Sequence, residues 1–195
     1  MRIATIQIEG LTPYSQSRPL MSQKARNESH DEFDARVWTE HLHTDPQQKT
    51  VIIPATSINQ GLAEAAAYLS KGGELKKKGQ ATWSQNFRCG LSVGHAPALH
   101  DTKPADARAE KVYCHANGKR GSGSRVWRTF PVFDTWSATL TVHILDDTIP
   151  EEVFRRVVAA FGLFIGIGRH RPENGGYLGR FQVADLEIEN LTDAA

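Results

Sequence analysis

Residues 161–181 combine glycines and arginines in a pattern that suits contact with phosphate groups. Glycine lets a backbone approach a ligand closely or adopt a positive φ, and an arginine guanidinium matches phosphate geometry. A helix-like run precedes this glycine–arginine loop, and a strand-like run over Tyr177–Ile188 follows it. A dinucleotide fingerprint needs the reverse order, strand, then glycines, then helix. The loop therefore favours contact with a polynucleotide backbone, and an ordinary charged surface loop is the open alternative. Its candidate nucleic-acid-binding residues are Arg169, His170, Arg171, Tyr177 and Arg180.

A second basic cluster lies between Lys111 and Phe133, a stretch without Asp or Glu. Aromatic residues interleave with its cations, and a positive groove with aromatic platforms suits single-stranded nucleic acid because every base presents a π-face. The candidate binding residues here are Lys119, Arg120, Arg125 and Trp127, with Lys111, Tyr113, Arg128 and Phe130 beside them. The alternative places the aromatic rings in the core and the cations in solvent. Lys76–Lys78 is a third basic run with the same two interpretations.

Histidines and carboxylates offer weaker candidates for catalysis or metal binding. His41 and His43 could share one face of a strand with Asp45 nearby, while His95, His100 and His115 are scattered and no Cys-x-x-Cys occurs. Asp31 and Asp34 could serve a nuclease only with a base or a metal ion. We therefore predict no catalytic residue, no metal ligand and no cofactor. A binding protein is favoured over an enzyme, and an endoribonuclease is the enzymatic alternative.

Composition limits the class of protein. The chain has 195 residues and a formal net charge of +1, so a nucleic-acid surface must come from local clustering of charge. Cys89 and Cys114 are too few for a disulfide framework and are expected as reduced thiols. Neither a signal-peptide core nor an apolar run long enough for a bilayer is present. We expect a soluble, cytoplasmic protein.

The order of elements predicts the fold. Alternation predicts strands over residues 3–11, 51–53, 82–93 and 136–144, and helical spacing predicts helices over 58–69 and 153–161. A final strand follows the glycine–arginine loop. Two strand–helix–strand halves predict an α+β fold, a ferredoxin-like or RNA-recognition-motif core with a glycine-rich loop before the last strand. We expect a single domain over residues 1–195, with β-rich insertions at about 12–48 and 74–130.

Three segments resemble the RAMP superfamily, the RNA-binding subunits that form the backbone of CRISPR effector complexes. They are Ile52–Leu62 (strand, proline, first helix), Trp136–Phe161 (second strand–helix unit) and Gly166–Phe181 (glycine-rich loop). The family usually has a phosphate-binding Lys in the first-helix motif, where this chain has Asn59 and Gln60. The chain is also short for a backbone subunit, which leaves room for a reduced relative from a mobile element.

The resemblance implies an antiviral-defence protein that binds single-stranded, crRNA-like RNA through its phosphates. Single-stranded DNA remains a less favoured ligand. The implied partners are other subunits of a ribonucleoprotein complex or further copies of the chain, and no membrane. A RAMP-family endoribonuclease and a phage-type mimic that binds CRISPR subunits stay open. Replacing Arg169 and Arg171 with Ala should weaken binding and leave the fold intact.

Overall fold

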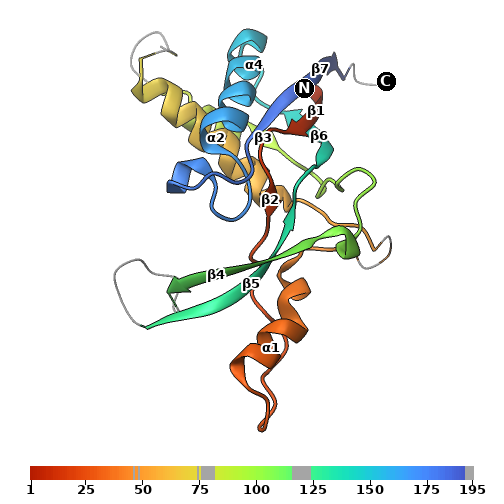
Figure 1. The fold of residues 1–195 in the computed structure, drawn as a ribbon. Coiled ribbons are helices and arrows are strands. Elements are labelled where there is room, and N and C mark those ends of the chain that lie inside the picture. The colour runs from red at the N-terminus through yellow and green to blue at the C-terminus, as the bar shows by residue number, and fades with distance from the viewer. Residues whose placement is uncertain (46, 48, 74, 76–81, 116–123, 192–195) are drawn as a thin grey trace.

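A four-stranded antiparallel sheet with two helices on one face forms the centre of the molecule (Figure 1). The computed structural model describes residues 1–45, 47, 49–73, 75, 82–115 and 124–191. The strands are β1 (Arg2–Gly10), β3 (Leu91–Ser92), β6 (Ser137–Ile144) and β7 (Phe181–Asn190), in the order β3-β6-β1-β7. With α2 (Ala55–Lys71) between β1 and β3, and α4 (Glu151–Ala160) between β6 and β7, the chain follows the β-α-β-β-α-β order of a ferredoxin-like fold. This confirms the predicted fold class.

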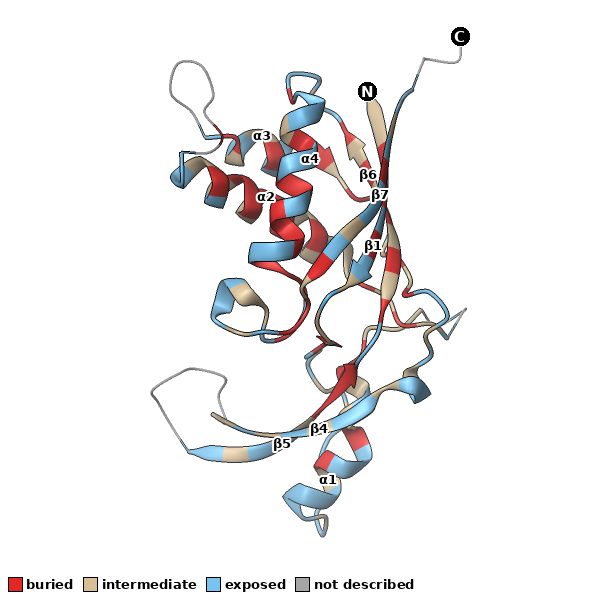
Figure 2. Ribbon diagram, turned by 45° about the horizontal axis from the view of Figure 1, so that its top comes forward, coloured by how far each residue is buried: buried red, intermediate tan, exposed pale blue. Residues whose placement is uncertain are grey.

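Alternating side chains explain why one face of this sheet is covered. Ala4, Ile6 and Ile8 of β1 are buried beneath the helices, while the residues between them reach the other face. The buried face of α4 includes Phe154 and Val158, and Figure 2 shows the buried positions gathered between the helices and the sheet. No helix among the described residues is long and apolar enough to cross a membrane.

A second antiparallel sheet projects from the first and carries the insertions. Its order is β2-β5-β4, with β2 (Tyr14–Ser15), β5 (Arg125–Phe133) and β4 (Arg108–His115). β4 pairs with β5 along its whole length, and the two strands form a long antiparallel hairpin. Helix α1 (His30–Val37) and the 3₁₀ turn η1 (Trp38–His41) pack beside β5. Figure 1 shows the hairpin and α1 together on one side of the central sheet.

Two predicted strands are wrong. The strand expected over residues 82–93 is instead α3 (Ser84–Cys89) followed by the two-residue β3, because Phe87 is buried opposite Phe154 of α4, with ring centroids 6.2 Å apart. Residues 51–53 form only isolated bridges, Thr44 with Val51 and Ile52 with Ala98. Residues 51–53 therefore lead into α2 without a regular strand. Short turns complete the description: η2 (Pro104–Asp106), η3 (Phe161–Ile165) and η4 (Pro172–Asn174).

Candidate nucleic-acid interface

The glycines of the glycine–arginine loop fold the loop against itself. Gly179 has a φ of +73°, and a Cβ there would lie 1.8 Å from the carbonyl oxygen of Ile167. A Cβ on Gly176 would lie 1.7 Å from the carbonyl oxygen of His170. No side chain fits at either distance. These two glycines therefore allow close backbone packing within the loop, which becomes a defined platform between η3 and β7.

Arg169 is buried and joins the loop to the second sheet. Its Nε donates to Ser15 Oγ at 3.0 Å, and its Nη2 donates to Glu110 Oε2 at 2.7 Å. The guanidinium lies 4.2 Å from the ring centroid of Phe130, and the residue is only 9% exposed. One side chain thus connects β2, β4 and β5 to the loop. These contacts conflict with the expectation that Arg169 can be removed without cost to the fold.

The other two loop arginines also have partners within the protein. Arg171 Nη2 lies 2.9 Å from a carboxylate oxygen of Glu64 and 3.2 Å from one of Glu173. Arg180 Nε donates to the carbonyl oxygen of Leu163 at 3.0 Å. The structure brings Arg169 and Arg171 to one cavity, described below, whereas Arg180 lies outside it. The carboxylates of Glu64, Glu110 and Glu173 therefore offset part of the positive charge of this loop.

One face of the β4–β5 hairpin carries an exposed row of cations and aromatic rings. Tyr113 pairs with Trp127 across the hairpin, with ring centroids 5.1 Å apart, and the two residues are 51% and 53% exposed. Lys111 Nζ lies 5.9 Å from the Trp127 ring, and the Arg125 guanidinium lies 5.9 Å from the Tyr113 ring. We call these four residues the cation–aromatic row. Lys119 and Arg120, like Lys76–Lys78, lie outside the described residues.

A cavity of about 390 Å³ joins the cation–aromatic row to the glycine–arginine loop. Tyr177, which is 56% exposed, lines it. The lining from the hairpin includes Lys111, Tyr113 and Trp127, and the lining from the loop includes Arg169, His170 and Tyr177. Two clusters that the sequence suggested separately therefore meet at one surface.

A second cavity, of about 320 Å³, lies on the other side of Arg169 and has polar walls. Arg18, His43 and Arg171 contribute cationic or titratable groups, and Ser57 and Gln60 contribute polar groups from the first turns of α2. Burial, aided by the nearby Arg18, lowers the pKa of His43. Sequence reasoning did not single out Arg18, because an isolated arginine in a polar stretch gives no signal.

His41, considered above as a possible metal ligand, has a packing role in the structure. His41 Nδ1 lies 2.7 Å from the carbonyl oxygen of Arg18, and the His41 ring packs on Phe130 at 4.8 Å between centroids. Across the described residues, no group of three His, Cys, Asp or Glu side chains could hold a metal ion. His41 is thus part of the packing between η1 and β5.

The uncovered face of the central sheet is a poor surface for nucleic acid. Cross-strand register places Glu9, Asp185, Glu187 and Glu189 on this face, together with the hydroxyls of Thr5, Thr139 and Thr141. Carboxylates repel phosphates, and the register places no Phe, Tyr or Trp side chain on this face, where His143 supplies the one ring from β1, β6 and β7. The positive, aromatic surface of the second sheet is the better candidate.

Comparison with known proteins supports the fold and leaves the activity open. No family model and no curated protein matches the chain. Among solved structures, a chain of the cryo-EM structure of the Type III-B Cmr-beta bound to cognate target RNA matches with a TM-score of 0.50 at 13% identity. The match covers 96% of this chain and 60% of that chain, so this protein spans less than two thirds of its neighbour's length. At this identity the likeness is one of fold alone.

Proposed function

We propose that this protein is a RAMP-like, CRISPR-associated subunit that binds single-stranded, crRNA-like RNA, chiefly through the RNA backbone. Residues 1–195 act as one domain in this proposal, with insertions at about 12–48 and 74–130 that build the binding surface. The matched fold comes from an RNA-bound CRISPR complex, which supports both RNA and neighbouring subunits as partners. A non-enzymatic role agrees with a surface of cations and aromatic rings.

The observation that carries the proposal is the cation–aromatic row beside the glycine–arginine loop. Stacking on an exposed ring tolerates any base, and adjacent cations hold the phosphates. Trp127 and Tyr177 are large aromatic residues left in solvent on opposite walls of one cavity. The cross-strand pair with Tyr113 stabilises the hairpin but leaves half of the Trp127 surface in solvent, which favours a ligand with flat faces and negative charge.

The site residues have distinct roles in this proposal. Trp127 and Tyr177 stack on bases, with Tyr113 beside Trp127, and Lys111 and Arg125 meet phosphates. Arg171 meets phosphate from the second cavity, and His170 lies next to the strand. Arg169 holds the two walls together. Arg180 extends the positive surface of the loop, and Lys119 and Arg120, which lie outside the described residues, are further candidate contacts from the basic segment.

Fluorescence anisotropy with a labelled single-stranded RNA tests the proposal. We expect Trp127→Ala to weaken binding about tenfold, since one base–aromatic stack contributes ~1–3 kcal/mol. The double variant Lys111→Ala/Arg125→Ala should reduce the slope of log affinity against log salt by roughly 1.4, because each single-strand phosphate contact contributes about 0.7. The same oligonucleotide made of DNA reports any contribution of the 2′-hydroxyls.

Tyr68→Ala is the matched control. Tyr68 is an aromatic residue on α2 that is 47% exposed, and it lines neither of the two cavities beside Arg169; its ring packs on Phe164 in the first residues of the glycine–arginine loop. This variant should keep wild-type affinity. Equal losses in Tyr68→Ala and Trp127→Ala, or no RNA binding by the wild-type protein, would overturn the proposal.

A further inference from the structure

The second cavity described above, of about 320 Å³, has walls of cationic and hydrogen-bonding groups. Arg18 and His43 line it from the first insertion, Arg171 from the glycine–arginine loop, and Ser57 and Gln60 from the first turns of α2. None of the described residues that line it is an Asp or Glu. Donors from three parts of the chain, with no carboxylate among them, suit an anion.

Arg18 carries a charge that nothing in the described part of the protein neutralises. Its backbone is fixed by His41, whose carbonyl oxygen lies 3.0 Å from the Arg18 N–H and whose Nδ1 lies 2.7 Å from the Arg18 carbonyl oxygen. No hydrogen bond or ion pair joins its partly buried guanidinium to another described residue. Burial and the neighbouring Arg18 charge lower the pKa of His43. Both observations indicate a place where a negative charge would be stabilised.

Arg171 is oriented by carboxylates that do not line the cavity. Its Nη2 lies 2.9 Å from a carboxylate oxygen of Glu64 and 3.2 Å from one of Glu173, and no hydrogen bond to another described residue uses its Nε or Nη1. A guanidinium has five donors, so these contacts fix its position and leave donors for a ligand. Arg169 is also paired, which leaves Arg18 as the arginine of this lining whose charge is not offset.

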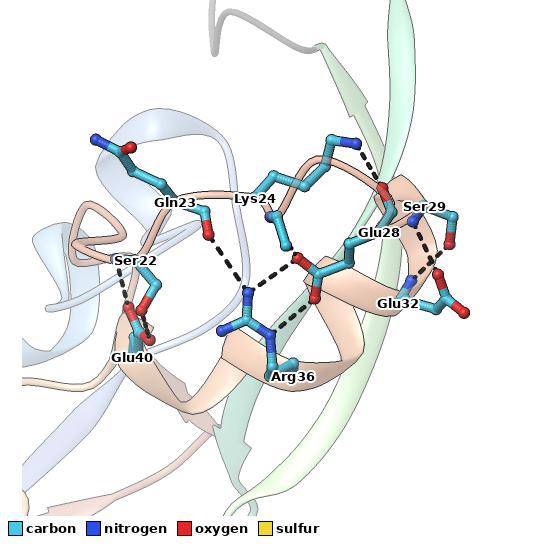
Figure 3. A network of polar contacts seen from close by, with 9 residues as sticks. Ser22, Gln23, Lys24, Glu28, Ser29, Glu32, Arg36 and Glu40 are labelled. Carbon is cyan, nitrogen blue, oxygen red and sulfur yellow. Dashed lines mark hydrogen bonds and ion pairs between the residues drawn. The ribbon is translucent and has the colours of Figure 1, made fainter.

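The first insertion is held in place by its own polar contacts (Figure 3). The hydroxyl and the backbone N–H of Ser22 donate to the two carboxylate oxygens of Glu40, at 2.5 and 3.1 Å. Closer to the cavity, the His43 backbone N–H donates to Gln16 Oε1 at 2.6 Å. These contacts fix the backbone on both sides of Arg18. A site whose walls are set in this way loses little entropy when a ligand binds.

We propose that this cavity binds the terminal phosphate of the RNA strand, a phosphomonoester, in preference to the phosphodiesters within the strand. A phosphomonoester has three non-bridging oxygens and a charge of about −1.5 to −2 at neutral pH, whereas a diester has two such oxygens and a single charge. Donors from three segments can each take one of the three oxygens. The first turn of α2 has neither a side-chain cap nor an acidic residue, so its dipole also favours the anion. This inference rests on the proposed RNA binding and adds recognition of the strand end.

The glycine–arginine loop places this cavity close to the cavity of the cation–aromatic row. His170 lines the cavity of the row, Arg171 lines the second cavity, and Arg169 lines both. A strand that stacks on Trp127 or Tyr177 therefore needs to cross only this part of the loop for its end to reach Arg171. A free phosphate compound has the same chemistry and is the rival occupant.

The test uses one internally labelled RNA oligomer with two hydroxyl ends, with a 5′-phosphate or with a 3′-phosphate. We expect the wild-type protein to bind one of the phosphorylated strands about tenfold to a hundredfold more tightly than the hydroxyl-ended strand, the gain of one hydrogen bond between charged groups. Arg18→Gln should remove this preference, chiefly by weakening the phosphorylated strand, and should keep the wild-type Tm because its guanidinium has no partner to lose. Arg26→Gln is the matched control. Arg26 is an exposed arginine of the same insertion that lines neither cavity beside Arg169, so this variant should keep the preference.

The outcomes separate this inference from the proposed function. Equal affinity for the three strands, or a preference that Arg18→Gln retains, overturns the end site and leaves RNA binding intact. An equal loss for all three strands in Arg18→Gln also overturns it, since Arg18 then meets a phosphate within the strand. Absence of binding to every strand overturns the proposed function, and the end site with it. Uridine 5′-monophosphate that binds as tightly as the phosphorylated strand, and that Arg18→Gln no longer binds, assigns the cavity to a small phosphate compound instead.

Discussion

Arg169→Leu tests whether the most buried arginine of the loop stabilises the fold or serves the ligand. The substitution removes the hydrogen bond to Ser15, the ion pair with Glu110 and the contact with Phe130. Breaking a buried ion pair costs ~3–5 kcal/mol. The Glu110 side chain keeps 22% exposure and can be partly hydrated, so we expect a loss of about 3 kcal/mol, the low end of that range.

Thermal unfolding followed by circular dichroism measures this loss. A domain of this size shifts its Tm by roughly 2–4 °C for each kcal/mol, which gives an expected decrease of about 6–12 °C. The double variant Arg169→Leu/Glu110→Leu should recover more than half of the loss, because neither charge then remains buried alone.

Arg180→Leu is the control for the loss of a loop arginine. Its guanidinium donates one hydrogen bond, to the carbonyl oxygen of Leu163, so its removal should cost about 1 kcal/mol. The reasoning is refuted if Arg169→Leu and Arg180→Leu unfold at the same temperature, or if the Arg169 and Glu110 substitutions are simply additive. Arg169 would then be free to act as a phosphate anchor alone.

Two further predictions concern the second cavity and the loop. The pKa of His43 is lowered in the free protein, and a bound phosphate favours the protonated ring, so RNA affinity should rise as the pH falls through the pKa of His43 in the complex and level off below its lowered pKa in the free protein. His43→Gln should flatten this profile, and identical profiles for both proteins would exclude phosphate from that cavity. Gly179→Ala should lower the Tm markedly and expose the loop to limited proteolysis, because a Cβ would lie 1.8 Å from Ile167 O at a φ of +73°; an unchanged Tm would contradict this account of the loop.

Local patterns explain which parts of the fold could be predicted. The alternation of β1 and β6 and the helical spacing in α2 are properties of neighbouring residues, so the sequence predicts them well. Strand β3 has only two residues and exists because it pairs with the end of β6. No local pattern could reveal it, and the helical turn before it was read as part of a strand.

The candidate site was predicted by residue type and only partly by position. The sequence identifies Trp127 and Arg125 as members of a basic aromatic segment, and register places them on one exposed face. It does not reveal that Glu110, 59 positions from Arg169, neutralises that arginine. It also gives no sign that α1 and η1 lie against β5, since that depends on how the first insertion packs against the second.

Strand β1 lies at the centre of the four-stranded sheet, and this position determines when it can pair during synthesis. Its two neighbours are β6 and β7, and Arg2 pairs with both Ile144 and Asn190. During synthesis β1 stays without either neighbour until residues 137–144 leave the ribosome, and at ~5–20 residues per second this takes many seconds. An apolar strand with free edges invites pairing with other chains. The sheet closes only when β7 joins it, so production of the intact protein depends on protecting the first strand until the last is available.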